Sequence, residues 1–92
     1  MIVGFRHKGL KLFFETGSTK GVNAAHKVKL ASILAALDVA MKPDELMLPS
    51  YRTHPLKGEL KGHWAIWVNG NWRVTFRFVG TDVELVDYQD YH

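Results

Sequence analysis

Residues 63–89 read HWAIWVNGNWRVTFRFVGTDVELVDYQ, and this stretch decides the fold. It contains three runs of β-branched and aromatic residues, separated at Asn69-Gly70 and again at Gly80-Thr81-Asp82. An Asn-Gly pair between apolar runs is the strongest short-range signal for a β-hairpin. The stretch therefore predicts an antiparallel meander with strands at residues 63–68, 72–79 and 83–89.

The middle strand predicts a sheet with one apolar and one basic face, because successive side chains of a strand point to opposite faces. One side carries Trp72, Val74, Phe76 and Phe78. The other side carries Arg73, Thr75 and Arg77. The apolar side is expected to cover the core, which leaves the basic side for function.

The first half of the chain predicts helices. Residues 1–5 form a short β-prone segment, and a brief helix should end at Gly17, which suits the left-handed cap position. Asn23 stands where the N-cap of a longer helix belongs. The apolar stripe of that helix is expected to be Leu30, Ile33, Leu34, Leu37 and Met41.

The elements that follow complete an α+β prediction. Pro43 should open one further turn, and Pro49 should end it. Residues 50–62 contain several turn formers and predict a loop or an irregular sheet edge. The expected fold is α+β, with an N-terminal strand and two helices before the meander, in a single domain over residues 1–92.

Composition excludes several classes of protein. With 92 residues there is room for one core, and 47% apolar and 23% charged residues are ordinary for a globular protein. The absence of cysteine rules out disulfides, thiolate zinc sites and a cysteine nucleophile, and it fits a cytoplasmic protein. No apolar run approaches the roughly 20 residues that span a bilayer, so no membrane association is expected.

Charge is distributed unevenly along the chain. Residues 1–29 carry six lysines and arginines against one glutamate, and residues 52–77 carry five against one. Residues 78–92 carry four carboxylates and no lysine or arginine. A basic surface beside a carboxylate cluster suits an anionic partner such as nucleic acid. A solvated surface of mixed charge explains the same pattern.

Two histidines can meet on the basic face of the sheet. His54 lies in the loop before the meander and His92 follows the last strand, while Lys57 and Arg73 can point to the same place. Two imidazoles with two cations suit RNA cleavage without a metal, in which a base activates the ribose 2′-OH and an acid protonates the leaving oxygen. Asp90 could orient an imidazole, and Tyr91 offers a ring for base stacking. Spacing alone also permits two solvated histidines with no role.

Five short segments, taken together, resemble the HigB branch of the RelE-like toxins. They are residues 7–11 (HKGLK), 14–17 (FETG), 54–58 (HPLKG), 71–76 (NWRVTF) and 87–92 (DYQDYH). The resemblance implies a small fold like that of microbial RNases. By matching position, it assigns catalytic roles to His54, Asp90, Tyr91 and His92, and phosphate binding to Lys57 and Arg73. It leaves open which histidine is the acid and which is the base.

The resemblance also implies a function and partners. The expected function is that of a type II toxin that cuts mRNA in the 30S A site of the 70S ribosome without metal or other cofactor, and so stops translation. The expected partner is a helix-turn-helix antitoxin of the HigA type, and operator DNA is contacted only through the complex with it. The alternative is a module of the same fold that binds RNA or antitoxin without cutting.

Core packing or solvent exposure can also explain the remaining aromatic and basic residues. Trp64 and Trp72 are expected in the core, whereas Trp67 is expected either to contact the antitoxin or to be partly buried against the N-terminal strand. No histidine sits at a recurrent zinc spacing, so no metal site is expected at His26 or His63. Lys20, Lys27 and Lys29 should form a solvated face that can also touch ribosomal RNA.

Overall fold

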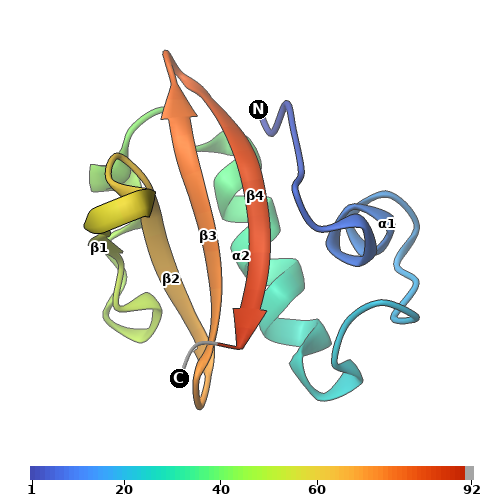
Figure 1. The fold of residues 1–92 in the computed structure, drawn as a ribbon. Helices are drawn as coiled ribbons and strands as arrows, with labels where there is room; N and C mark the ends of the chain where they lie inside the picture. The colour runs from blue at the N-terminus through green and yellow to red at the C-terminus, as the bar shows by residue number, and fades with distance from the viewer. Residues whose placement is uncertain (91–92) are drawn as a thin grey trace.

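The second half of the chain forms an antiparallel sheet with one strand more than the sequence predicts. The computed structural model describes residues 1–90, and these form a four-stranded sheet in the order β1-β2-β3-β4 (Figure 1). The strands are β1 (His54–Pro55), β2 (Trp64–Asn69), β3 (Trp72–Val79) and β4 (Asp82–Asp90). The three predicted strands correspond to β2, β3 and β4.

The additional strand lies in residues 50–62, where the sequence predicts a loop or an irregular sheet edge. His54 and Pro55 pair with Ala65 and Trp64 of β2. A strand of two residues shows no alternation, and proline, which lacks an amide hydrogen, is confined to sheet edges. Two short 3-10 turns flank this strand, η3 (Pro49–Tyr51) before it and η4 (Gly58–Leu60) after it.

The hairpin between β2 and β3 turns one residue later than predicted. Asn69 already pairs with Trp72, so the two-residue loop is Gly70-Asn71 and not Asn69-Gly70. Gly70 has a φ of 55°, as the first loop residue of a type II′ turn requires. A bulge between Trp67 and Asn69 shifts the register and explains the difference.

The N-terminal segment is a strand only in part. It runs parallel to β4 along the sheet edge opposite β1, with isolated bridges from Ile2 to Val83 and from Phe5 to Val86 (Figure 1). Leu85, with a φ of 54°, lies between the two bridged positions of β4 and bends that strand. The predicted N-terminal strand is therefore reduced to two points of pairing.

Both predicted helices are present. Helix α1 (Lys8–Thr16) ends at Gly17, whose φ is 79° and whose amide donates to the Phe13 carbonyl at 2.8 Å. The side-chain oxygen of Asn23 accepts from the Ala25 amide at 3.0 Å, as expected of a cap. That cap serves the 3-10 turn η1 (Ala24–His26), which leads directly into α2 (Lys27–Val39).

Helix α2 lies across one face of the sheet and supplies most of the helical core (Figure 1). Leu30, Ile33, Leu34 and Leu37 are buried as predicted. The assignment of Met41 to the same stripe is wrong, because α2 ends at Val39 and Met41 is 57% exposed. Helical backbone is sterically disfavoured for the residue before a proline, here Lys42. The chain therefore turns at Lys42 into η2 (Pro43–Leu46), and Leu46 is buried in place of Met41.

The sheet meets α2 through the apolar side that the alternation predicts. Val74 and Phe76 are fully buried, and Trp64 and Trp72 pack against the same core while remaining partly exposed. The Trp72 ring stacks on the Tyr88 ring with centroids 4.5 Å apart. Within residues 1–90, no helix is both long and apolar enough to cross a bilayer.

Candidate active site on the polar face of the sheet

The register of the sheet brings polar side chains into two rows on the face away from the core. The first row crosses all four strands through His54, Ala65, Thr75 and Asp87. The second row joins Trp67, Arg73 and Gln89. Alternation places both rows on one face. The basic face predicted from β3 is therefore present, and His54 lies at its edge.

His54 is held in one orientation by its own loop. Its ring Nδ1 lies 2.8 Å from the Arg52 carbonyl oxygen, and Arg52 has a left-handed φ of 48°. A carbonyl can only accept a hydrogen bond, so Nδ1 is the donor. In the neutral imidazole the lone pair is then on Nε2, which can take a proton from a substrate.

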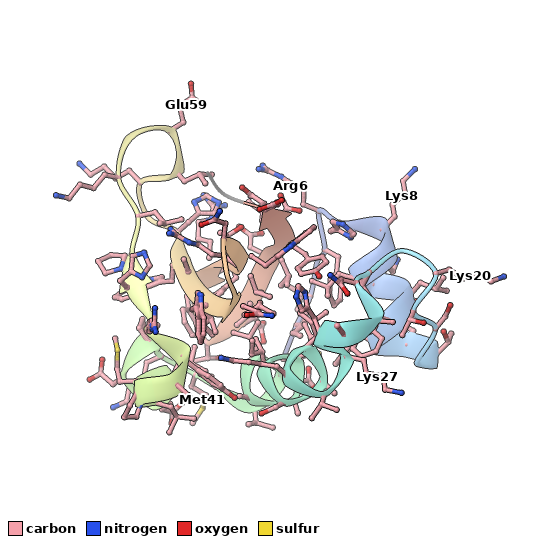
Figure 2. The ribbon with its side chains drawn as sticks, turned by 90° about the horizontal axis from the view of Figure 1, so that it is seen from below. Arg6, Lys8, Lys20, Lys27, Met41 and Glu59 are labelled. Atoms are coloured by element: carbon pink, nitrogen blue, oxygen red, sulfur yellow. The ribbon has the colours of Figure 1, made fainter. Side chains whose placement is uncertain are left out.

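Lys57 lies on the exposed loop that follows β1. The base of this loop is fixed by a hydrogen bond of 2.9 Å from the Leu56 amide to the His63 carbonyl. Lys57 lines a hollow of about 390 Å³ together with Leu56, Glu59 and Leu60. Glu59 projects outward from the tip of the loop (Figure 2). The ammonium group of Lys57 is thus carried on a segment open to a large ligand.

Arg73 lies near the centre of the polar face and is half-buried. Two strand spacings, roughly 10 Å, separate its strand from that of His54. The intervening strand contributes Ala65, the smallest side chain in the first row, which is fully buried.

Asp90 ends β4 and is exposed. It pairs with Trp72, so alternation places it on the side of Trp72 and not on the side of Arg73. Tyr91 and His92 lie outside the described residues. Of the six residues assigned by resemblance, the structure therefore places His54 and Arg73 on one face, Lys57 on the adjoining loop and Asp90 at the strand end.

Residues 3–92 match the family model described as RelE-like toxin of type II toxin-antitoxin system HigB. The chain belongs to this HigB-like toxin family. It is also 47% identical to Endoribonuclease HigB of Proteus vulgaris over 92 residues, which cover all of both chains. The protein is accordingly the toxin of a type II toxin–antitoxin system, and it is an endoribonuclease.

A solved structure supports the fold of the HigB-like toxin. The YoeB-YefM complex from Staphylococcus aureus matches with a TM-score of 0.64 and 16% identity, covering 100% of this chain and 98% of that chain. At this identity the likeness shows a shared fold. The resemblance read from the sequence motifs is thus confirmed at the level of family, α+β fold and enzyme class.

Three further polar residues, Thr75, Asp87 and Gln89, lie on this face and form a hydrogen-bond network. Asp87 accepts hydrogen bonds from the Tyr88 amide at 2.9 Å and from Gln89 Nε2 at 3.0 Å, and the same Nε2 lies 3.2 Å from Thr75 Oγ1. This network crosses β3 and β4 beside Arg73. The alternate spacing of Asp87 and Gln89 in the last strand, which places both side chains on one face, is the sequence signal for this network.

Trp67 of the HigB-like toxin lies at the opposite edge from the N-terminal segment. The expected burial of Trp67 against that segment is therefore wrong, because residues 1–5 run along β4. Its ring instead lies beneath two cations, Lys29 Nζ at 4.2 Å and Arg52 Cζ at 4.1 Å from the centroid. Lys29 is thus not part of a freely solvated face with Lys20 and Lys27.

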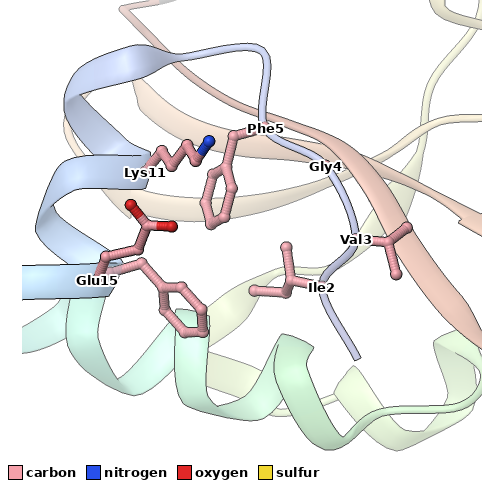
Figure 3. Close-up of a pocket in the computed structure, with 7 residues that line it drawn as sticks. Ile2, Val3, Gly4, Phe5, Lys11 and Glu15 are labelled. Atoms are coloured by element: carbon pink, nitrogen blue, oxygen red, sulfur yellow. The ribbon is translucent and has the colours of Figure 1, made fainter.

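Two further histidines are buried, and a second hollow is lined by residues of the N-terminal segment and α1. His26 Nδ1 lies 2.6 Å from the Tyr88 hydroxyl, while His63 is buried with neither ring nitrogen bonded to any of residues 1–90. Within those residues, no three histidine, aspartate or glutamate side chains converge as a metal site requires. A second hollow of about 350 Å³ lies between the N-terminal segment and α1, and no histidine lines it (Figure 3).

Proposed function

We propose that this endoribonuclease cuts mRNA held in the A site of the ribosome, by attack of a ribose 2′-OH on the adjacent phosphorus and without a metal. The observation that carries the proposal is the fixed tautomer of His54, whose Nδ1 donates to the Arg52 carbonyl. An imidazole bound in this way presents Nε2 as a base.

The residues divide the reaction between them. His54 Nε2 takes the proton of the 2′-OH, the 2′-oxygen forms a bond to phosphorus, and the 5′-oxygen of the next nucleotide leaves. His92, by its family position, returns a proton to that oxygen. The products are a 2′,3′-cyclic phosphate and a 5′-hydroxyl, so no water or metal is needed for bond breaking.

The cations stabilise the charge that develops on the phosphate. Arg73 can offer two parallel N–H groups to phosphate oxygens, and Lys57 adds a mobile point charge from the loop. Asp90 is proposed to orient an imidazole, and Tyr91 to stack on the base beside the cleaved bond. These two roles rest on matching position in the family.

The openness of the site supports dependence on the ribosome. The hollow beside Lys57 is lined only by residues of its own loop, so nothing there forces a flexible strand into line for attack. Holding reacting groups in line is worth about 7–11 kcal/mol in well-oriented systems. We propose that the ribosome supplies that alignment and that free RNA is cut poorly.

The toxin is further proposed to act in the cytoplasm and to be held inactive by a helix-turn-helix antitoxin of the HigA type. The family supports an antitoxin partner, since its members belong to type II toxin–antitoxin systems. Contact with operator DNA would then pass through the complex and not through the toxin alone.

The test is cleavage of mRNA on programmed bacterial ribosomes, with the same mRNA free in solution for comparison. Wild-type protein is expected to cut the bound mRNA efficiently and the free mRNA poorly. His54→Ala, His92→Ala and the double variant should lose cleavage by about 100-fold or more while remaining folded by circular dichroism. Equal cleavage of free and bound mRNA would refute ribosome dependence, and full activity of the double variant would refute the histidine mechanism.

A further inference from the structure

Two cations contact one indole ring beside the candidate active site. Lys29 reaches Trp67 from α2, and Arg52 reaches it from the turn after η3. Neither side chain takes part in an ion pair with any of residues 1–90, whose ion pairs are the Met1 amino group with Asp82 and Arg77 with Glu84. Two like charges are thus held beside one ring, and neither forms an ion pair with a carboxylate of those residues.

Two members of this Trp67 cluster (Lys29, Arg52 and Trp67) are also held by hydrogen bonds to groups outside it. Lys29 Nζ donates to the Ser50 carbonyl at 2.9 Å, and the Trp67 ring nitrogen donates to the Gly70 carbonyl at 2.8 Å. Burial and the neighbouring Arg52 charge lower the pKa of Lys29. Repulsion between the two like charges costs free energy in the free protein, and an anion bound near both of them would offset that cost.

The Trp67 cluster adjoins the polar face that carries His54 and Arg73. Trp67 is the register partner of Arg73 and therefore lies one strand spacing, about 4.8 Å, from it. The Arg52 carbonyl also accepts the hydrogen bond from His54, so Arg52 belongs to the Trp67 cluster through its side chain and orients His54 through its backbone. Because β1 pairs only with Trp64 and Ala65, no strand among residues 1–90 covers β2 at Trp67.

We propose that Lys29 and Arg52, held over Trp67, bind a backbone phosphate of the RNA strand being cut, next to the phosphate that reacts. The proposal rests on the proposed function, because the reacting phosphate fixes where the neighbouring one lies. The indole holds the two cations in place, and its partly exposed edge extends the surface available to a nucleotide.

The test measures binding of an uncleavable RNA, a single strand of about eight nucleotides with 2′-O-methyl groups throughout. Fluorescence anisotropy at several salt concentrations compares Lys29→Gln/Arg52→Gln with the control Lys20→Gln/Lys27→Gln. The control removes the same charge, and Lys27 lies about 200° around α2 from Lys29. The first pair should bind about 10-fold more weakly, with the slope of log K against log salt smaller by about 0.7, as loss of one phosphate contact predicts.

Equal affinity for the two double variants, or no measurable binding by wild type at low salt, would overturn the proposal. Binding to empty ribosomes tests ribosomal RNA as a second source of phosphate. If the Lys29→Gln/Arg52→Gln variant loses affinity for ribosomes but binds the oligonucleotide as wild type does, the cluster contacts ribosomal RNA and the proposal is overturned. Lys29→Gln alone leaves the Arg52 backbone intact and should show part of the effect if the double variant misfolds. Cleavage by wild type on programmed ribosomes tests the proposed function separately, since the anisotropy measurement needs no cleavage.

Discussion

His54 donates its Nδ1 hydrogen to the carbonyl oxygen of Arg52, two residues before it, and the left-handed backbone of Arg52 makes this contact at 2.8 Å possible. The orientation of the imidazole therefore depends on a backbone conformation and not on a carboxylate. An altered backbone at Arg52 should change the chemistry, and an altered side chain should change binding of RNA.

Two substitutions separate these effects. Arg52→Gly keeps the left-handed conformation and should raise KM with little change in kcat. Arg52→Val disfavours that conformation by about 1–3 kcal/mol, so His54 loses its acceptor and kcat should fall as well. Cleavage rates on programmed ribosomes over a range of toxin concentrations separate kcat from KM. Identical kcat values would show that the Arg52 carbonyl does not position His54.

The two exposed lysines of the loop after β1 should differ in effect. Lys57 lines the hollow of that loop, whereas Lys61 follows η4 and does not. Lys57→Gln should slow cleavage by about 10-fold to 100-fold, as loss of a group that stabilises transition-state charge does. Lys61→Gln removes the same charge and should leave the rate near that of wild type. A similar loss in both variants would point to net charge and not to a site at Lys57.

A close approach of two glycines fixes α1 against the loop before η1. A Cβ added to Gly9 would lie 2.5 Å from the Gly21 carbonyl oxygen, and one added to Gly21 would lie 2.5 Å from the Gly9 Cα. Gly9→Ala ordinarily favours a helix, yet here it should destabilise the protein by about 1–3 kcal/mol. Urea unfolding measures the loss. Gly4→Ala, whose Cβ would meet only ordinary contacts at 3.9 Å, is the control and should unfold near wild type.

Stability at alkaline pH should depend on Tyr88. Burial raises the pKa of Tyr88 above its ordinary value, with the nearby Asp90 charge adding to the effect. The unfolded chain therefore loses this proton at lower pH than the folded chain, so the contribution of Tyr88 is full below about pH 10 and declines above it. In urea unfolding, the stability advantage of wild type over Tyr88→Phe should shrink between about pH 8 and pH 11. A constant difference across that range would contradict the assignment.

The sequence predicts the parts of the fold that repeat a pattern over several residues. The apolar stripe of Leu30, Ile33, Leu34 and Leu37 predicts α2, and alternation in β3 predicts both faces of the sheet. Local irregularities carry no such signal. The bulge after Trp67 moves the hairpin turn to Gly70-Asn71, and the early end of α2 removes Met41 from the core.

The candidate site shows the same division. Motifs identify His54, Lys57 and Arg73, and the structure gives them a shared face or an adjoining loop. The hydrogen bond from His54 to Arg52 depends on the left-handed backbone of Arg52, and an arginine gives no sequence signal for that conformation. The cations over Trp67 come from positions far apart in the chain, so only the packing of α2 against the sheet edge reveals them.

The proposed attack by the ribose 2′-OH can be tested by one substitution in the substrate. An mRNA with a single 2′-deoxynucleotide immediately before the cleaved bond is placed on programmed ribosomes and treated with wild-type toxin. This mRNA is expected to stay intact at that bond, whereas the all-ribose mRNA is cut to a 2′,3′-cyclic phosphate and a 5′-hydroxyl. Cleavage of the deoxy-substituted bond, or products ending in a 5′-phosphate, would contradict it.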